Sequence, residues 1–274
     1  MTFLILNLCL ILLLPFYSAN ISTNLQSSFI HNIVNGDKTI RATPFFVLIQ
    51  LDFFDRECAG AVIHRKWVVT SALCITHESG HSTKADEIII LVRKFDTNVE
   101  RGKAVLASNI FIPDDFDQNH HTNDLALIKL QKTLPQFRVI EMCKENPASF
   151  DTHVIAVGVG STSQSPLTPA TSLREITLKT SPFQFIDSWL KFDFCPPGLV
   201  CTETTVRGSG LCHNDDGSPL FLRDCETKKP ICLLGIATPT LKDESPLIDC
   251  KGQADFTSIP HSKDWISTSI MSNQ

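Results

Sequence analysis

The sequence predicts an all-β fold, and three observations favour it. The chain has 274 residues, of which 43% are hydrophobic and 19% charged, as in ordinary folded proteins. Short apolar or β-branched runs, broken by polar stretches, recur along it. Only two segments have helical spacing. The runs cover residues 45–53, 58–74, 87–95, 103–112, 124–130, 153–159, 173–180, 219–222, 231–238 and 254–259. Many short strands of this kind are typical of a β-barrel or a β-sandwich.

The first segment of the chain is predicted to lie outside this fold. Residues 3–16 form an apolar run that is too short to span a bilayer and fits a secretory signal peptide over residues 1–19, cleaved after Ser18 or Ala19. Residues 20–32 are a short polar lead-in. No later run is long and apolar enough to anchor the chain in a membrane. The prediction is therefore a secreted, extracellular protein.

Two helices are expected among the strands. Phe185, Trp189 and Phe192 have helical spacing and predict a short intermediate helix. Residues 260–271, with Trp265 and Ile266, predict a helix near the C-terminus. The polar segment 143–152 is the expected junction between two halves of the fold.

Charge and motif content exclude several classes of ligand. With 24 Lys and Arg against 29 Asp and Glu, the net charge is −5, and no basic run suggests nucleic-acid binding. His77 to His81 match the pattern H-E-x-x-H, but the Ser-Gly pair within it is a poor helix former, and the motif needs a helix to bind zinc. The adjacent carboxylates of Asp215 and Asp216 are weak evidence for a cation site. We predict no metal and no cofactor.

The cysteine count indicates structural disulfides in an oxidising compartment. The chain has ten cysteines, and Cys9 would leave with the signal peptide. Nine is an odd number, so one thiol is predicted to be unpaired or bonded to another chain.

Three motifs carry a family resemblance. Residues 67–74 read W-V-V-T-S-A-L-C, residues 123–130 read N-D-L-A-L-I-K-L, and residues 212–220 read C-H-N-D-D-G-S-P-L. Together they resemble W-V-L-T-A-A-H-C, D-I-A-L-I-K-L and C-x-G-D-S-G-G-P-L of the chymotrypsin-like (trypsin-type) serine protease family. The resemblance covers residues 33–271 and implies two six-stranded antiparallel β-barrels with a cleft between them, in a single domain over residues 33–274.

The same resemblance implies that the catalytic groups are missing. Leu73 stands where the family has its general-base histidine and Asp216 where it has its nucleophilic serine, while Asp124 matches the orienting aspartate. Seven positions separate Cys212 from Pro219, as in the family, so no gap hides a serine. Asn214 replaces the glycine whose amide helps to form the oxyanion hole. The chain is therefore predicted not to be an enzyme.

Two further family positions concern the buried carboxylates. Asp124 should resist ionisation unless hydroxyl or backbone donors satisfy it, and Thr238 holds the position of such a hydroxyl. Ile33 and Asp215 match the pair that the family joins after activation cleavage. Because His31 and Asn32 precede Ile33, the chain is either cut by an enzyme that prefers Asn or stays single-chain, and we favour the second.

The specificity pocket also departs from the family. Gly210 holds the floor position where trypsin-type members have Asp, so no preference for Lys or Arg is implied. Ala254 replaces a pocket glycine, and a longer loop runs from Thr240 to Cys250.

The resemblance suggests a partial set of disulfides. It implies Cys58–Cys74 and Cys212–Cys250, while Cys225–Cys232 and Cys195–Cys201 are the nearest pairings for the remaining residues. Cys143 is then left over, and a disulfide-linked partner through it is one expectation.

The leading hypothesis is a secreted inactive homologue that acts by protein binding. Its expected roles are cofactor, decoy or regulator of extracellular proteolysis in a reproductive, immune or salivary fluid, with an unidentified extracellular protein partner. The alternatives are a serine-type endopeptidase with a rearranged site and a passive secreted carrier. His120 and His121, in the loop before Asp124, offer a replacement base, but without a hydroxyl nucleophile they have nothing to activate.

Overall fold

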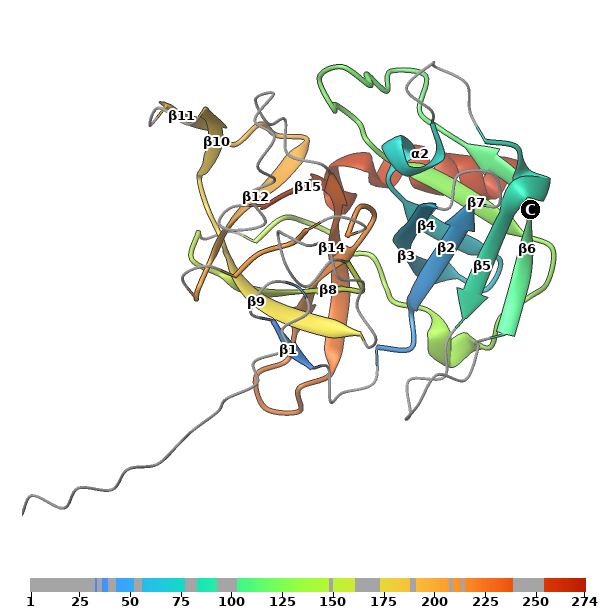
Figure 1. Cartoon of the computed structure of the whole chain (residues 1–274), viewed down its shortest axis with the longest axis horizontal. Coiled ribbons are helices and arrows are strands. Elements are labelled where there is room, and N and C mark those ends of the chain that lie inside the picture. The colour runs from blue at the N-terminus through green and yellow to red at the C-terminus, as the bar shows by residue number, and fades with distance from the viewer. Residues whose placement is uncertain are drawn as a thin grey trace, which may run out of the picture.

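Two closed β-barrels stand side by side in the computed structural model of the chain (Figure 1). The residues that it describes are 33, 36–38, 43–51, 56–76, 83–92, 103–147, 150–160, 173–187, 191–206, 209–212, 215–238 and 254–274. The predicted signal peptide and lead-in lie outside these ranges.

Six antiparallel strands form the N-terminal barrel, in the order β2-β3-β4-β7-β6-β5. Their bounds are β2 Phe46–Leu51, β3 Arg56–His64, β4 Trp67–Thr70, β5 Ile88–Val92, β6 Lys103–Phe111 and β7 Ala126–Leu130. The residues that fill this barrel are mostly Val, Ile and Leu, which suit a pleated surface that is buried on one side.

Six further strands form the C-terminal barrel, in the order β9-β12-β15-β14-β13-β8, and the pairing of β8 with β9 closes the ring. Their bounds are β8 His153–Gly158, β9 Arg174–Thr180, β12 Leu199–Thr204, β13 Pro219–Arg223, β14 Pro230–Thr238 and β15 Ala254–Ser258. The short strand β1 (Asp37–Lys38) adds to the outer edge of β9. Two closed six-stranded barrels confirm the predicted fold class.

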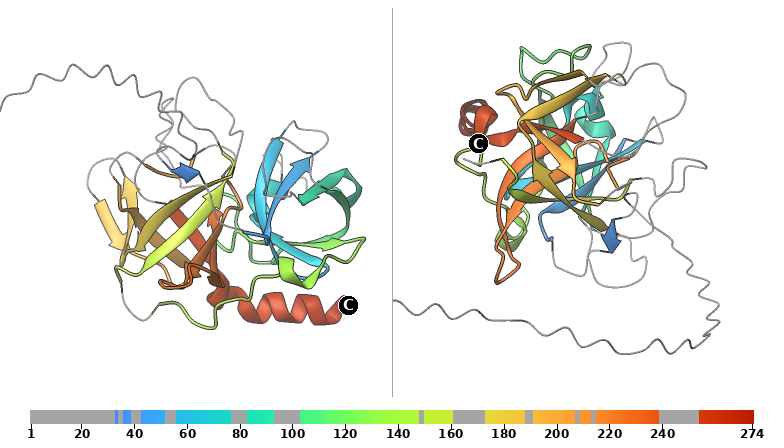
Figure 2. Two further views of the ribbon diagram at one scale, coloured as in Figure 1. Left: turned by 90° about the horizontal axis from the view of Figure 1, so that it is seen from below. Right: turned by 90° about the vertical axis from the view of Figure 1, so that its left-hand side faces the viewer.

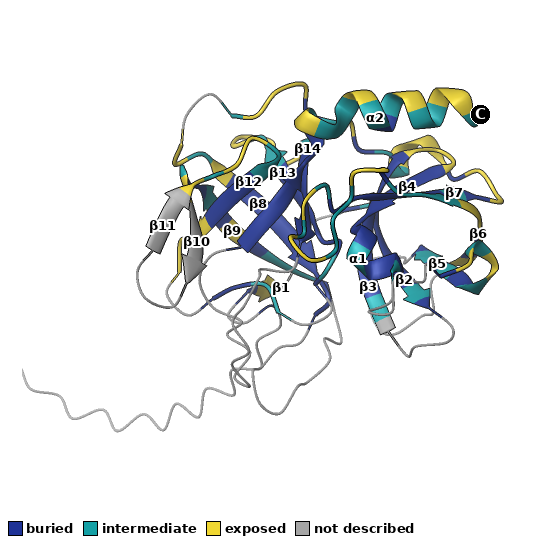
Figure 3. Ribbon diagram, turned by 90° about the horizontal axis from the view of Figure 1, so that it is seen from above, coloured by how far each residue is buried: buried dark blue, intermediate teal, exposed yellow. Residues whose placement is uncertain are grey.

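A third apolar cluster joins the barrels. Phe45 from the first barrel meets Phe221 from the second edge to face, with ring centroids 5.2 Å apart. Both rings are almost fully buried. In Figure 3 the strands that face this junction are dark blue along much of their length, as expected for a shared core. The two barrels are therefore fixed against each other by packing.

The C-terminal helix is confirmed as α2 (Ile259–Ser272), and Ser258 caps it by accepting a hydrogen bond from the His261 amide at 3.3 Å. Figure 2 shows that it starts at the C-terminal barrel and runs beneath the N-terminal one. Its Ile266 is fully buried in the cluster between the barrels. The other helical turns are α1 (Ala72–Ile75), η1 (Ala85–Glu87) and η2 (Gln136–Arg138). No helix in the described ranges is both long enough and apolar enough to cross a membrane.

The predicted intermediate helix is wrong. Strands β10 (Phe183–Asp187) and β11 (Lys191–Phe194) form a two-stranded antiparallel hairpin there instead. The register pairs Phe183 with Phe194 and Phe185 with Phe192, so the phenylalanines recur every second residue, which is the period of a strand. The helical interpretation relied on Trp189, which lies outside the described residues.

Candidate functional site

Asp124 is the centre of the candidate site. It directly precedes Leu125 and β7, and its side chain is completely buried at the junction of the two barrels. The loop before it is tightly turned, since His121 and Asn123 both have a φ of 52°. An acid in this position must be satisfied by donors from the surrounding elements.

The N-terminal end of α1, with Ser71 just before it and Leu73 within it, supplies two of these donors. The Ser71 hydroxyl lies 2.8 Å from Asp124 Oδ1 and 2.7 Å from Oδ2, and the Leu73 amide donates to Oδ1 at 2.8 Å. Ser71 occupies the position before α1, where a serine often caps the helix, but its hydroxyl makes no capping bond. That hydroxyl serves the carboxylate instead.

The third donor comes from the C-terminal barrel. Thr238, at the end of β14, donates its hydroxyl to Asp124 Oδ2 at 2.7 Å, as predicted from its position. Burial raises the pKa of the Asp124 carboxyl above its ordinary value, and the hydrogen bonds that it accepts oppose this rise. The apolar side chain of Leu73 offers no titratable group to this acid.

The turn that carries Asp216 is built as a sharp elbow. Gly217 has a φ of 79°, and a Cβ there would lie 2.2 Å from the Ala59 carbonyl oxygen, so only glycine fits. The Ala59 amide donates to the Asp216 carbonyl at 2.9 Å and fixes the elbow against β3. Asp216 is half-buried, and its charge contributes to raising the pKa of both Asp124 and Asp215. The elbow therefore presents a carboxylate beside two buried acids.

Asp215 points away from this group into the C-terminal barrel. Its carboxylate accepts hydrogen bonds from the amides of Gly160 at 2.8 Å and Cys212 at 2.9 Å. Burial, with a smaller contribution from Asp216, raises its pKa to about 7. Ile33 is fully buried in the core of the same barrel, with a φ of 40°. No hydrogen bond joins Ile33 to Asp215 within the part of the chain that is described.

Gly158 makes the pocket around Asp215 possible, and sequence reasoning missed it. A Cβ on Gly158 would lie 2.1 Å from Asp215 Oδ1 and 2.8 Å from the Ser218 hydroxyl oxygen. The sequence contained a usable signal, because a glycine inside a strand often marks the close approach of another group.

The remaining predicted site positions are only partly described. Gly210 is buried, and Ala254 is buried in the core of the C-terminal barrel. Asn214 and Thr240 lie outside the described residues, as do His77 and His81. In the described ranges, no three His, Cys, Asp or Glu residues come together as a metal site would require.

One of the two loop histidines, His120, has a described partner outside the elbow. His120 is exposed, and its Nδ1 lies 2.7 Å from Asp117 Oδ2. His120 thereby holds the pKa of Asp117 below its ordinary value. It is engaged in a surface turn.

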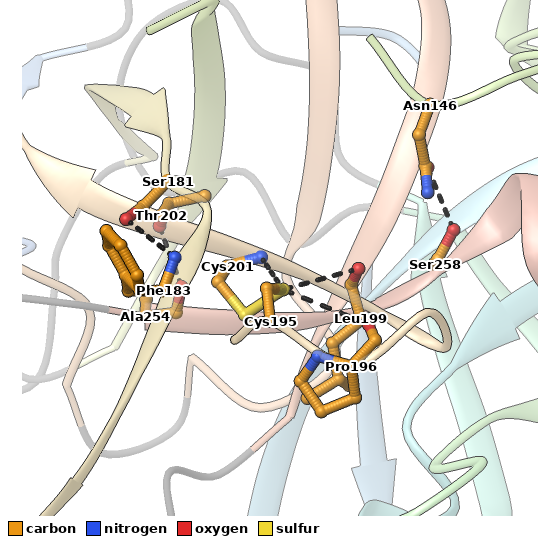
Figure 4. The surroundings of a disulfide bond; sticks show 10 residues. All are labelled: Asn146, Ser181, Phe183, Cys195, Pro196, Leu199, Cys201, Thr202, Ala254 and Ser258. Atoms are coloured by element: carbon orange, nitrogen blue, oxygen red, sulfur yellow. Dashed lines mark hydrogen bonds between the residues drawn. A yellow bond between two sulfur atoms is a disulfide. The ribbon is translucent and has the colours of Figure 1, made fainter. Parts of the chain in front are cut away.

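Two predicted disulfides are confirmed, Cys58–Cys74 and Cys195–Cys201. The second closes a six-residue separation at the base of the β10–β11 hairpin, where the Cys201 amide also donates to Cys195 Sγ at 3.1 Å (Figure 4). Cys212 is disulfide-bonded, and its expected partner Cys250 lies outside the described residues.

The other predicted pairings need correction. Cys232 bonds to Cys143 and not to Cys225, because the amides and carbonyls of residues 141–143 pair with Leu233 and bring the two sulfurs together. Cys225 lies in the turn beyond the paired ends of β13 and β14, where it is exposed and free. Cys143 is therefore paired within the chain and not with a partner, and among the described cysteines the free thiol is Cys225.

Comparison with known proteins agrees with this geometry. The chain is 27% identical to ovochymase of Halocynthia roretzi and 22% identical to coagulation factor XII of Rattus norvegicus, over 75% and 77% of its own length. It spans only 13% and 36% of those two relatives. It is 25% identical to human azurocidin, with 89% of both chains covered.

Solved structures give the same picture of the fold. Human heparin binding protein aligns with a TM-score of 0.66 at 23% identity, over 88% of this chain and 98% of the other. A variant of that protein gives a TM-score of 0.67. Residues 33–266 match the Trypsin family. The chain therefore belongs to the trypsin family of chymotrypsin-like serine proteases.

Proposed function

We propose that this protein is a catalytically inactive member of the family and acts by binding other proteins. The observation that carries the proposal is the set of groups around Asp124. The carboxylate that should orient an imidazole is satisfied by two hydroxyls and one amide, and the side chain at the base position is Leu73.

The chemistry of peptide hydrolysis supports this proposal. Acyl transfer in this family needs a hydroxyl to attack and an imidazole to take and return its proton. The Leu73 side chain can neither accept this proton nor return it. The carboxylate of Asp216 is a poor nucleophile toward an amide. A negative charge at this elbow also opposes the oxyanion of the transition state. Loss of the nucleophile or base alone costs on the order of a millionfold in turnover in subtilisin.

A rearranged active site finds little support among the nearby serines. Ser71, Ser209 and Ser218 are all fully buried, and the Ser71 hydroxyl is held by Asp124. A nucleophile must reach a substrate carbonyl, and these side chains have no access to one. The alternative of a working endopeptidase is therefore disfavoured.

Secretion and the extracellular role belong to the same proposal. Three described disulfides support an oxidising compartment, in which such bonds persist. We infer a role as cofactor, decoy or regulator of extracellular proteolysis, with a protein partner. Family membership supports this role, because a fold shaped to bind polypeptides keeps its surface when the acid–base pair is lost.

A serine-directed fluorophosphonate probe tests the loss of activity. We expect no labelling of the secreted protein and no cleavage of a panel of peptide amides, with active trypsin as the positive control. Labelling of any serine in the chain, mapped by mass spectrometry, would overturn the proposal.

Affinity capture from the source fluid separates a specific binder from a passive carrier. The bait is the secreted chain, beside an Asp216→Lys variant at the elbow and an Asp224→Lys variant in the distant β13–β14 turn. We expect the unmutated chain and the Asp224→Lys variant to capture the same partner protein. The Asp216→Lys variant should not capture it. Capture that is equal for all three baits, or absent, would contradict binding through the former active site.

A further inference from the structure

Strands β10 and β11 form what we call the aromatic hairpin, at the edge of the C-terminal barrel. It lies on the side of that barrel that faces away from the N-terminal barrel (Figure 1). Four of the chain's 18 phenylalanines fall within these two short strands. The rings of Phe183 and Phe194 contact each other, with centroids 5.6 Å apart, yet they remain 41% and 75% exposed. Exposed aromatic side chains gathered at one place indicate an interaction site.

The base of the aromatic hairpin is fixed to the C-terminal barrel. The Cys195–Cys201 disulfide ties the end of β11 to β12, and the Cys195 amide donates to the Pro182 carbonyl at 2.8 Å. Beyond this base, β10 and β11 pair only with each other among the described strands. A two-stranded sheet is marginally stable alone and gains from a further strand. The aromatic hairpin is therefore firmly attached, but in the described ranges no third strand extends it.

The hydrogen-bond pattern shows which backbone groups face the outer edge of β11. The register pairs Phe185 with Phe192, so Pro182 lies opposite Cys195. The bond from the Cys195 amide to the Pro182 carbonyl makes these two residues a hydrogen-bonded pair, and such pairs alternate along an antiparallel ladder. Three positions further on, Phe185 and Phe192 are a non-hydrogen-bonded pair. The amide and carbonyl of Phe192 therefore point to the outer edge of β11, where a further strand would pair.

The residues around Phe192 are complementary to a second copy of themselves. Strand β11 reads Lys191-Phe192-Asp193-Phe194. When two β11 strands pair antiparallel about Phe192, each Lys191 lies opposite the Asp193 of the other copy. Opposite charges at facing positions stabilise such a pair, whereas like charges destabilise it. The same register places Phe185, Phe192 and their two counterparts in one row across four strands. The hydrogen-bond pattern and the charge pattern thus select the same centre.

We propose that two copies of the chain associate through the aromatic hairpin, β11 against β11, to form one four-stranded antiparallel sheet. A twofold axis at Phe192 makes this contact isologous, so it closes at two copies. A membrane is another surface that exposed aromatic residues suit. The two acidic residues of the hairpin, Asp187 and Asp193, outnumber its one lysine and oppose the negative potential of a lipid surface. The dimer does not depend on whether the protein is inactive.

Sedimentation velocity of the full secreted chain over a range of concentrations tests the proposal. We expect a reversible equilibrium between monomer and dimer. Lys191→Asp places like charges opposite each other at both facing positions, and so does Asp193→Lys. Each variant alone should therefore weaken dimerisation by about tenfold or more. Within the hairpin Asp193 lies opposite the neutral Gln184, so Asp193→Lys leaves the pairing of β10 with β11 intact.

Mixing the two variants gives the specific test. In the mixture, the Lys191→Asp strand faces the Asp193→Lys strand with opposite charges at both positions, so a one-to-one dimer should form again. Both variants keep a net negative charge, so the overall charge of the chain does not drive their association. Lys103→Asp, at an exposed position of β6 in the other barrel, changes the net charge as Lys191→Asp does and should dimerise like the unmutated chain.

The proposal is wrong if the unmutated chain stays monomeric up to its solubility limit, if dimers persist equally in both charge variants, or if their mixture stays monomeric. A monomer that binds phosphatidylcholine vesicles would assign the aromatic hairpin to a membrane and would also overturn the proposal.

Discussion

At the scale of single residues, a hydroxyl satisfies the buried Asp124 carboxylate beside the apolar Leu73. Ser71 stands where the family motif has alanine, and its side chain contacts both oxygens of Asp124. A buried carboxylate left without donors would cost several kcal/mol. Ser71 thus makes the apolar Leu73 tolerable beside a buried acid.

Removal of this hydroxyl should destabilise the fold. We expect Ser71→Ala to lower the free energy of unfolding by about 1–3 kcal/mol, because a buried acceptor loses a donor. Denaturant titration measures the change. Ser108→Ala is the matched control, since that serine is exposed and should cost less than about 0.5 kcal/mol. Equal stability of the Ser71 variant and the unmutated protein would contradict the assigned role.

Restoring catalysis should need more than the histidine. Leu73→His alone is expected to give no detectable hydrolysis of peptide amides, while Leu73→His with Asp216→Ser gives a trace. Adding Ser71→Ala should raise that trace, because the Ser71 hydroxyl no longer competes with the imidazole for Asp124. Turnover measurements on the three variants check the order. Activity in the single variant that matches the double would show that Asp216 does not block the reaction.

At the scale of elements, the disulfides decide which turns are anchored. Cys143–Cys232 closes a separation of 89 residues and ties the link between the barrels to β14. Cys225, only seven positions before Cys232, remains a thiol in the β13–β14 turn. The disulfide of Cys143 therefore constrains the fold, whereas the free thiol of Cys225 does not.

Variants of Cys143 and Cys225 should therefore differ clearly in stability. Cys143→Ser removes a long-range crosslink and should lower stability by roughly 2–5 kcal/mol. Cys225→Ser should leave stability within about 0.5 kcal/mol and abolish the reaction of the folded protein with a thiol reagent. Thermal unfolding and thiol titration measure both effects. A stability loss in the Cys225 variant as large as in the Cys143 variant would contradict the observed pairing.

The sequence predicted the elements that follow from a local residue pattern or from a family motif. Strand runs, the end helix and the role of Thr238 were accessible because each follows from residue pattern or motif position. The β10–β11 hairpin was missed because three aromatic residues at helical spacing obscured a period of two. The pairing of Cys143 was missed because it depends on which strands are neighbours, which spacing along the chain does not fix.

At the scale of the whole molecule, two buried carboxylates bias stability in the same direction. Burial raises the pKa of Asp215 to about 7 and also raises that of Asp124. An unfolded aspartate titrates near pH 3.9, so the folded state holds protons that the unfolded state releases. This contribution is fully present below about pH 4 and is lost as the pH rises through 7.

Stability should therefore fall between about pH 4 and pH 7. At about 1.4 kcal/mol per unit of pKa, Asp215 alone accounts for a few kcal/mol of this change. Asp215→Asn should show a shallower slope, whatever its stability at one pH, and denaturant titrations across the range measure it. A stability that instead rises with pH would mean that Asp215 faces a cation, as the family resemblance implies for a chain cut before Ile33.

The described segments before β2 and after β15 each pack against the barrel that is farther away in sequence. Ile33 and β1 pack on the C-terminal barrel although β2 begins the other one, and α2 leaves β15 to reach the N-terminal barrel, where Lys129 bonds to the Asn273 carbonyl. Each barrel is thus held by a segment, here called a strap, that continues from the other barrel, so we expect the two barrels to unfold together. Calorimetry should record one cooperative transition for the molecule, and two resolved peaks would mean that the straps do not couple the halves.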